Sequence, residues 1–242
     1  NIVDIFVDAD DVLWCAGTGL SRFDPSGLIG FTRRDGVSGL ISEGGTAGVF
    51  AIERESEKHF WIGTGHSGAF RTDGKKLEAP VLAKLMVTQI HRAGDGVLWF
   101  GTHNGIDKFE NGQMVRVMER NSVNALTSDA QGSLWYGDGW QGGGLSRFNP
   151  KTREDATFTT ADGLPDNHVW AIEPARDGGV WVGTEKGLAR YRNGQIEDFR
   201  EKLGIMTGAV WELRRDPNGA LWISSAHGLH ILEPISNEGR AD

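Results

Sequence analysis

The feature that most constrains this chain is a short motif that occurs six times along its 242 residues. Each copy has a tryptophan, a short run that is usually rich in glycine, and then a glycine followed by an apolar residue. The tryptophans are Trp14, Trp61, Trp99, Trp135, Trp181 and Trp222. Each lies twelve residues after a β-branched residue, and these are Ile2, Val49, Val87, Val123, Val169 and Val210. Such regular spacing predicts one array of similar structural units.

The unit from Val169 to Phe199 is the clearest copy. Asp177-Gly178 and Asn193-Gly194 are turn signals that separate short runs of strand-forming residues. The predicted strands are Val169–Glu173, Gly179–Gly183, Leu188–Tyr191 and Gln195–Phe199. Four short antiparallel strands in about forty residues are typical of one blade of a β-propeller.

The whole chain is therefore predicted to be all-β, a six-bladed β-propeller of four-stranded antiparallel blades in a single domain, 1–242. The expected blades are 1–48, 49–86, 87–122, 123–168, 169–209 and 210–242. The second blade has only a weak fourth strand near Leu77–Val81, and the stretch 234–242 contains no convincing strand. Either the last blade has three strands, or the ring contains blades that this chain lacks.

The overall composition limits the kinds of binding partner that the chain can have. The formal net charge of −8 argues against nucleic acid or an anionic membrane as the main partner. Cys15 is the only cysteine, so no intramolecular disulfide framework is expected. No apolar run reaches the roughly 20 residues that span a bilayer, and the first residues do not have the composition of a signal peptide.

Two stretches resemble a known family. Asp177–Tyr191 has the pattern Asp-Gly-x-x-Trp-Val-Gly-Thr-x-x-Gly-Leu-Ala-Arg-Tyr, and Asp162–Val169 precedes it as a linking segment. Both resemble the two-component regulator propeller repeat. The resemblance implies a periplasmic or extracellular sensor module of a bacterial signalling protein that responds to glycans or other small ligands. The output domain would then lie in a parent protein or in a partner.

Streptogramin lyases are a similar family of propellers, which use a histidine pair, a glutamate and a divalent cation. Their repeat resembles Gly-x-x-Trp-Phe-Thr, whereas this chain has glycine in its Trp-x-Gly-Thr motif. That departure favours the sensor family over the lyases.

The repeated residues are predicted to be structural. A tryptophan buried between blades contributes a large apolar area, and the threonine of Trp-x-Gly-Thr is expected to form a hydrogen bond in its turn. Function is instead expected in the loops, which do not repeat. The turn between the second and third strands supplies His66, His103, Asn104, Asp138, Trp140, Gln141, Glu185, Lys186 and His227 as candidate ligand-binding residues.

Three of these candidates are histidines from different blades, His66, His103 and His227. Three histidines can form an open zinc-type site. However, these are spread around the repeat without short ligand spacing, and we expect no metal site and no cofactor.

Aromatic residues near the start of the first strands form a second candidate set. Phe50, Trp170 and Trp211 occupy the same repeat position, and His168 is close to Trp170. They either line the central channel or pack against the next blade. Trp140 lies among glycines in an inserted loop, where no packing pattern requires it, and it is the strongest single candidate for ligand binding.

Three functions remain open. The first is a non-enzymatic sensor-type module that binds a carbohydrate or another small molecule. The second is a metal-dependent lyase or hydrolase that uses His66, His103, His227 and Glu185. The third is a platform for protein interactions, which rests on the fold alone.

Overall fold

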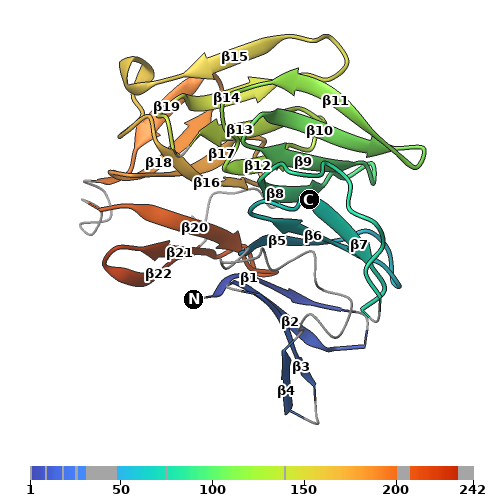
Figure 1. Ribbon diagram of the computed structural model, residues 1–242. Helices are drawn as coiled ribbons and strands as arrows, with labels where there is room; N and C mark the ends of the chain where they lie inside the picture. The colour runs from blue at the N-terminus through green and yellow to red at the C-terminus, as the bar shows by residue number, and fades with distance from the viewer. Residues whose placement is uncertain are drawn as a thin grey trace, which may run out of the picture. The chain divides into compact units, whose positions relative to one another are not determined.

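The computed structural model describes residues 2–8, 10–17, 19–24, 27–30, 48–74, 76–138, 140–200 and 208–233 (Figure 1). Two compact units divide the chain, 1–123 and 124–242. The described residues form antiparallel β-sheets, and one short 3₁₀ helix, η3 (Thr160–Asp162), lies in the second unit. They contain no helix with the length and apolarity that a membrane crossing requires.

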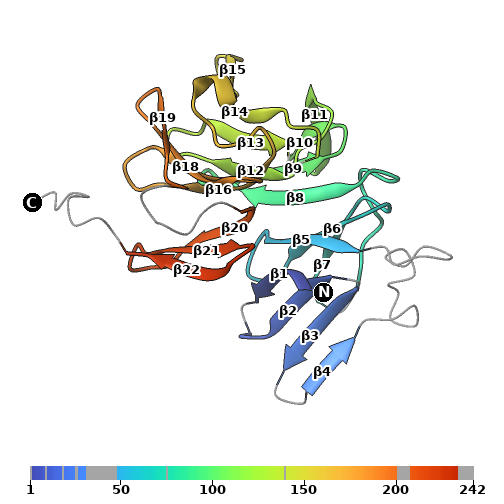
Figure 2. The same ribbon diagram turned by 90° about the vertical axis from the view of Figure 1, so that its left-hand side faces the viewer.

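Unit 1 contains three sheets (Figure 2). Sheet 1 consists of β1 (Ile2–Val7), β2 (Leu13–Gly17), β3 (Leu20–Asp24) and β4 (Gly27–Gly30). Sheet 2 consists of β5 (Val49–Arg54), β6 (Phe60–Thr64) and β7 (Ala69–Thr72). Sheet 3 consists of β8 (Val87–Arg92), β9 (Leu98–Thr102), β10 (Gly105–Glu110) and β11 (Gln113–Glu119). Each strand pairs with the next one along the chain.

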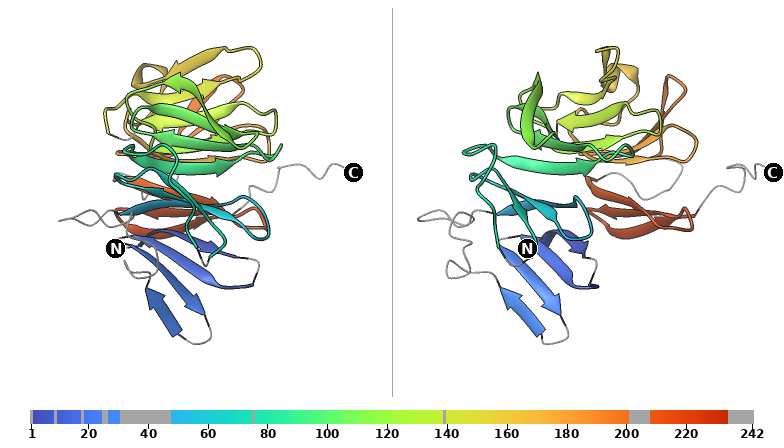
Figure 3. Two further views of the ribbon diagram at one scale, coloured as in Figure 1. Left: turned by 45° about the vertical axis from the view of Figure 1, so that its right-hand side comes forward. Right: turned by 90° about the vertical axis from the view of Figure 1, so that its right-hand side faces the viewer.

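Unit 2 also contains three sheets, and its strands run in colour from yellow-green to red (Figure 3). Sheet 4 consists of β12 (Ala125–Ser128), β13 (Leu134–Asp138), β14 (Gly144–Phe148) and β15 (Asp155–Phe158). Sheet 5 consists of β16 (Val169–Pro174), β17 (Val180–Thr184), β18 (Gly187–Arg192) and β19 (Gln195–Asp198). Sheet 6 consists of β20 (Val210–Arg215), β21 (Leu221–Ser225) and β22 (Gly228–Leu232).

Sheets 2 and 6 depart from the predicted four strands. In sheet 2, the expected strand near Leu77–Val81 is reduced to two isolated bridges, Thr72 with Leu77 and Ala69 with Val81. Pro80 lies inside this segment and has no N–H to donate, so a regular ladder cannot form there. In sheet 6 the described residues form three strands, and the stretch 234–242 lies outside the described residues.

Tryptophans of the repeat hold neighbouring sheets together inside each unit. In unit 1, Trp14 packs with Ile52 and Phe60, and Trp61 packs with Ile90 and Phe100. In unit 2, Trp135 packs with Ile172 and Tyr191, and Trp181 packs with Leu213 and Leu221. The structural role predicted for these four tryptophans is thus confirmed. Trp222 differs because it is partly exposed.

A carboxylate six residues before the tryptophan satisfies the indole N–H in four sheets. The Nε1 atom of Trp14 donates to Asp8 at 2.8 Å, that of Trp61 to Glu55 at 2.9 Å, and that of Trp135 to Asp129 at 2.9 Å. Trp222 donates to Asp216 at 3.3 Å. A buried indole N–H without a partner would destabilise the fold, and these carboxylates remove that penalty by accepting the hydrogen bond.

The threonine of Trp-x-Gly-Thr closes the turn between the second and third strands, as predicted. The hydroxyl groups of Thr64, Thr102 and Thr184 donate to the carbonyl oxygens of Gly68, Gly105 and Gly187 at 2.8, 3.0 and 2.8 Å. All three threonines are buried. The hydroxyl groups of these threonines are therefore engaged in the turn. Ligand binding, if it occurs here, falls to the residues at the tip of the turn.

Candidate functional site

The residues predicted for ligand binding come together best in unit 2, around the turns of sheets 4 and 5. Trp140 and Gln141 lie in the loop that joins β13 to β14. Asp138, the last residue of β13, accepts hydrogen bonds from the backbone N–H groups of Trp140 and Gln141, both at 2.9 Å. Such an Asx-type turn fixes the start of the loop. Asp138 therefore shapes the loop that carries Trp140.

Trp140 is the most exposed aromatic side chain of this loop region, with 64% of its surface accessible. Its ring lies edge-to-face on Trp170, with centroids 5.7 Å apart and an interplanar angle of 84°. The Nε1 atom of Trp170 donates to Oε2 of Glu185 at 2.7 Å. Two indole rings and one carboxylate thus form a connected surface in which Trp140 remains open to solvent.

A β-bulge explains how Trp170 comes to face this surface. The register between β16 and β17 shifts between Val169 and Ala171, so Trp170 is the additional residue. Sheets 2 and 6 show the same shift around Phe50 and Trp211. Bulges redirect a side chain out of the regular alternation of a strand. These three aromatic residues therefore occupy the same repeat position because each is the additional residue of a β-bulge.

Asp166 was not among the residues that the sequence singled out, yet it connects two of them. Its Oδ2 atom lies 2.6 Å from Nζ of Lys186, and its Oδ1 atom lies 2.6 Å from Nδ1 of His168. Oδ1 also accepts the backbone N–H of His168 at 2.9 Å. The His168 ring lies so close to Gly142 that a Cβ there would be 3.1 Å from Cε1 of the ring. Asp166 therefore orients two polar side chains beside the Trp140 loop.

We call these residues the Trp140 cluster: Trp140, Asp166, His168, Trp170, Glu185 and Lys186. The carboxylate of Asp166 is nearly buried, and burial raises its pKa. The hydrogen bonds from Lys186 and His168 lower the pKa more, and the net pKa is about 2. The carboxylate is thus ionised in the folded protein over the whole physiological range.

This low pKa predicts a specific pH dependence. The pKa in the folded chain is about 2, below the ordinary value of 3.8. Ionised Asp166 therefore stabilises the fold above pH 4, by about 2 kcal/mol, and this contribution is lost as the pH falls from 4 to 2. Asp166→Asn should be less stable than the parent chain at neutral pH, and the difference should shrink toward pH 3. Urea unfolding at several pH values measures it, and a difference independent of pH would contradict the assignment.

The other candidates in unit 2 lie apart from this cluster. Trp211 is exposed on β20, and His227 is exposed in the turn between β21 and β22. The backbone N–H of His227 donates to Oγ of Ser225 at 3.1 Å. In the described part of unit 2, neither side chain forms a hydrogen bond or a ring contact with the Trp140 cluster.

Four candidates belong to unit 1, where most of them serve local structure. The Nδ1 atom of His103 accepts the backbone N–H of Met86 at 3.0 Å, and the carbonyl oxygen of Asn104 accepts from Nη1 of Arg116 at 2.6 Å. The Phe50 ring lies against Gly65, where a Cβ would be 2.9 Å from Cε2 of the ring. His66 is exposed. No group of three or more histidine, cysteine, aspartate or glutamate side chains within the described residues is arranged to hold a metal ion.

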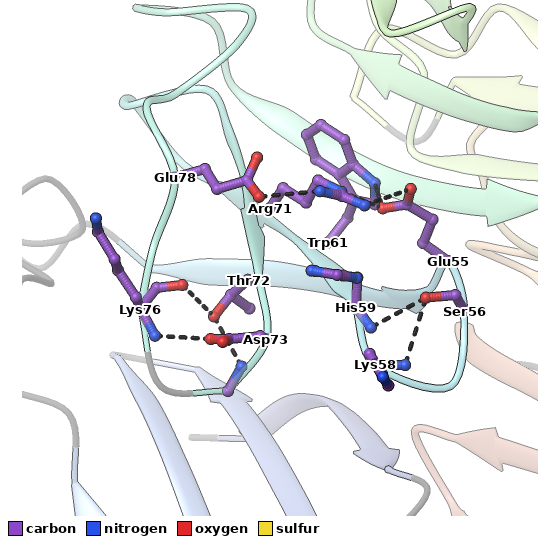
Figure 4. Close-up of polar contacts among 11 residues, drawn as sticks. Glu55, Ser56, Lys58, His59, Trp61, Arg71, Thr72, Asp73, Lys76 and Glu78 are labelled. Carbon is purple, nitrogen blue, oxygen red and sulfur yellow. Dashed lines mark hydrogen bonds and ion pairs between the residues drawn. The ribbon is translucent and has the colours of Figure 1, made fainter.

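Unit 1 also contains a cavity beside β7 that the sequence did not indicate. Its volume is about 500 Å³, and Glu55, Trp61, Arg71, Glu78, Val81 and Phe109 are among its lining residues. Figure 4 shows Arg71 between the carboxylates of Glu55 and Glu78. Nε of Arg71 lies 2.6 Å from Glu55, and Nη1 lies 2.9 Å from Glu78. Glu55 also accepts from the buried Trp61, so the charged groups satisfy one another and the cavity offers a ligand few free polar atoms.

A smaller cavity of about 310 Å³ adjoins this region and is lined by His59, Asp73, Lys76 and Glu78, among others. Backbone hydrogen bonds hold its loops: Ser56 Oγ accepts from the N–H groups of Lys58 and His59, and Asp73 accepts from that of Lys76 (Figure 4). These contacts build two turns of sheet 2. The Trp140 cluster remains the better candidate site because its aromatic ring is accessible.

A known protein family matches part of the repeat that the sequence shows. Residues 163–186 match the family described as two component regulator propeller. This segment includes Asp166, His168, Trp170, Glu185 and Lys186, which belong to the Trp140 cluster. No curated protein sequence matches the chain.

Several solved structures have the same fold. The extracellular domain of a hybrid two-component system from B. thetaiotaomicron has a TM-score of 0.77 and 23% identity, covering 97% of this chain and 34% of that one. A catalytically inactive virginiamycin B lyase from Staphylococcus aureus, solved with quinupristin, has a TM-score of 0.75 and 16% identity, covering 97% and 80%. The WD40 β-propeller domain of Doa1 has a TM-score of 0.69 and 13% identity, covering 96% and 78%.

The chain therefore spans about a third of the length of the first of these proteins. At such identities the likeness establishes the fold and not the activity. The likeness therefore shows a β-propeller fold, and one segment of the chain, residues 163–186, is similar to the two component regulator propeller family.

Proposed function

We propose that this chain is a non-enzymatic, sensor-type module that binds a carbohydrate or another small molecule at the Trp140 cluster. The observation that supports it best is the exposed indole of Trp140, which is supported edge-on by Trp170. An exposed tryptophan on a loop costs solubility and adds nothing to the core, so a binding role gives a physical reason for its presence.

The chemistry of the cluster suits a ligand with one apolar face and a polar edge. An indole ring offers a flat apolar surface, and a sugar ring has an apolar face of similar size surrounded by hydroxyl groups. The carboxylate of Glu185 lies beside the two rings and can accept hydrogen bonds from hydroxyl groups. Asp166 holds Lys186, whose ammonium group is a donor, and His168, whose Nδ1 donates to Asp166 and whose neutral ring then has an acceptor at Nε2.

The repeat also supports a proposal about the cellular location of this module and the system in which it acts. The matched segment belongs to a family of two-component regulators, and the first similar structure is the extracellular domain of a hybrid two-component system. We therefore propose a periplasmic or extracellular location and a role in a bacterial signalling system. The six sheets are, in this proposal, six blades of one propeller, with the boundaries predicted from the repeat.

Replacing Trp140 tests the proposed site. A thermal-shift screen with glycans and small metabolites first identifies a ligand, which at about a hundred times its Kd should add roughly 2.7 kcal/mol of stability. Trp140→Ala should then weaken binding of that ligand by about 2 kcal/mol, or roughly 30-fold in Kd, because an exposed anchor of this kind contributes much of the affinity. Isothermal titration calorimetry measures the change.

Two controls make this result specific. Trp222→Ala removes another partly exposed tryptophan of unit 2, outside the cluster, and should leave the Kd unchanged. The titration is repeated with a chelator and with added magnesium or zinc. Unchanged affinity in Trp140→Ala would contradict the proposed site. Binding or turnover that a chelator abolishes would contradict the non-enzymatic module and favour the metal-dependent alternative.

A further inference from the structure

The two indole rings of the Trp140 cluster meet nearly at a right angle. All residues of the cluster belong to unit 2. The planes of Trp140 and Trp170 are 84° apart, so the two rings form a corner with an aromatic face on each side. The face of an aromatic ring carries negative potential and attracts cations. The arrangement of the rings therefore favours a positively charged group over a negatively charged one.

Glu185 adds a negative charge at the edge of this corner. Its Oε2 atom accepts from Nε1 of Trp170 at 2.7 Å, which fixes the carboxylate beside the ring. Glu185 is exposed, and within the described part of the chain its side chain forms no ion pair. An indole N–H is a neutral donor, so it orients the carboxylate without cancelling the charge. A negative charge thus remains available beside two aromatic rings.

The repeat gives no structural reason for a carboxylate at position 185. The turn uses only the backbone N–H of Glu185, which donates to the carbonyl oxygen of His168 at 3.0 Å. Sheets 2, 3 and 6 form the same hydrogen bond with other residue types: Gly65 to Gly48, His103 to Met86 and Ala226 to Ala209. Glycine, histidine and alanine thus serve the same turn, and the charge of Glu185 has no part in forming it.

Lys186 does not supply a free positive charge, because its ammonium group is already paired. Its Nζ atom lies 2.6 Å from Oδ2 of Asp166. Asp138 adds another carboxylate, which accepts backbone N–H groups of the Trp140 loop. With His168 neutral, the loop and the cluster contain the carboxylates of Asp138, Asp166 and Glu185 against a single ammonium group. This excess of negative charge disfavours an acidic ligand.

We propose, with the function proposed above as the basis, that the ligand of the Trp140 cluster carries a protonated amino group, and that among carbohydrates it is a sugar with a free amine. The ammonium group binds against the indole faces beside Glu185, and the sugar ring packs on Trp140. Cation–π attraction and charge attraction act together at such a site. A neutral sugar has only the apolar contact, and an acidic sugar is repelled.

Three linear tetrasaccharides of different charge test this proposal at pH 6. They are the glucosamine tetramer, which is cationic, the N-acetylglucosamine tetramer, which is neutral, and the galacturonate tetramer, which is anionic. Isothermal titration calorimetry of the whole chain should give the lowest Kd for the glucosamine tetramer and the highest for the galacturonate tetramer. Added salt should reduce the difference, because it screens the attraction between exposed charges.

Glu185→Gln is the matched variant. The amide oxygen of glutamine can still accept from Nε1 of Trp170, so the ring corner is kept while the charge is removed. The Kd of the glucosamine tetramer should rise roughly fivefold, whereas that of the N-acetylglucosamine tetramer should not change. Glu154→Gln is the control, because it removes the same charge from an exposed position next to β15 and should leave both Kd values unchanged.

The outcomes separate this proposal from the one on which it rests. The proposal is overturned if the glucosamine tetramer does not bind, if it binds no better than the N-acetylglucosamine tetramer, or if Glu185→Gln weakens both equally. The Trp140 cluster would still be the binding site if Trp140→Ala weakened binding of the neutral tetramer or of another ligand from the thermal-shift screen. Binding that Trp140→Ala leaves unchanged for every ligand would instead contradict the site itself.

Discussion

Replacing Trp135 with alanine should reduce the free energy of unfolding by about 3–5 kcal/mol, the range expected when a fully buried aromatic side chain is removed. Only 1% of Trp135 is exposed. Its ring packs against Tyr191 with centroids 4.7 Å apart and against Phe158 at 6.4 Å. The guanidinium group of Arg147 lies 5.4 Å from the ring centroid. Alanine would leave a cavity where sheets 4 and 5 meet.

The lost hydrogen bond adds to this cost. Nε1 of Trp135 donates to Asp129, whose carboxylate is almost fully buried and also accepts the N–H groups of Gln131 and Ser133. Without the indole, Oδ2 of this buried carboxylate keeps only the long contact to Nη2 of Arg147 at 3.5 Å, and a poorly satisfied buried polar atom is destabilising. Urea unfolding, monitored by circular dichroism, should show a lower midpoint with little change in slope.

Trp140→Ala is the matched control for this measurement. It makes the same chemical change in the same unit, but Trp140 is largely exposed and lies outside the core. Its removal should change the unfolding free energy by roughly 0.5 kcal/mol or less in the absence of ligand. Equal losses in the two variants would mean that Trp135 does not anchor the packing between sheets 4 and 5.

Gly137→Val should also destabilise unit 2 strongly, by about 3 kcal/mol, because the new side chain has no room. A Cβ at Gly137 would lie 2.6 Å from Cβ of Val169 and closer still to its Cγ1. Val169 begins β16 of the next sheet and is fully buried. Either β16 or β13 must move outward. The reduced backbone entropy of the unfolded valine variant offsets only part of this cost.

The same close contact between a motif glycine and a β-branched residue occurs at other copies of the motif. A Cβ at Gly63, Gly101 or Gly183 would lie 2.9, 2.9 or 2.7 Å from Cγ1 of the repeat's β-branched residue, which is Val87, Val123 or Val210. Gly94→Val is the control, because Gly94 has no neighbouring heavy atom within 4 Å of such a Cβ. Thermal unfolding of both variants should show a large loss for Gly137→Val and a small one for Gly94→Val. Similar losses of stability in the two variants would show that backbone conformation, and not contact with Val169, is the reason for glycine at position 137.

These two expected results explain the motif that dominates the sequence. The tryptophan fills the space between adjacent sheets, and the glycine two residues later allows the β-branched residue of the next sheet to approach. The constant interval between the β-branched residue and the tryptophan reflects the length of one hairpin. Because these interactions repeat with the chain, the sequence alone was sufficient to predict most of the strands and turns, the threonine hydrogen bonds and most of the buried tryptophans.

The candidate site was only partly predictable. Trp140 could be recognised because the repeat gives no structural reason for a tryptophan among glycines. Trp170 was open to two interpretations, and its bulge and its contact with Trp140 decided how it is placed. Asp166 was not selected because it lies in a linking segment where an aspartate is ordinary. Its importance comes from Lys186, a residue twenty positions away that the fold brings to within 2.6 Å.

By itself, the sequence determined the features that depend on neighbours within one repeat, since hairpin length, turn residues and alternation are local properties of the chain. The tertiary structure alone decided the features that depend on what lies beside a sheet. Trp222 and Trp135 occupy the same position of the motif, and one is partly exposed while the other is buried. Burial of a side chain is set by the surface packed against it, and a local pattern does not encode that surface.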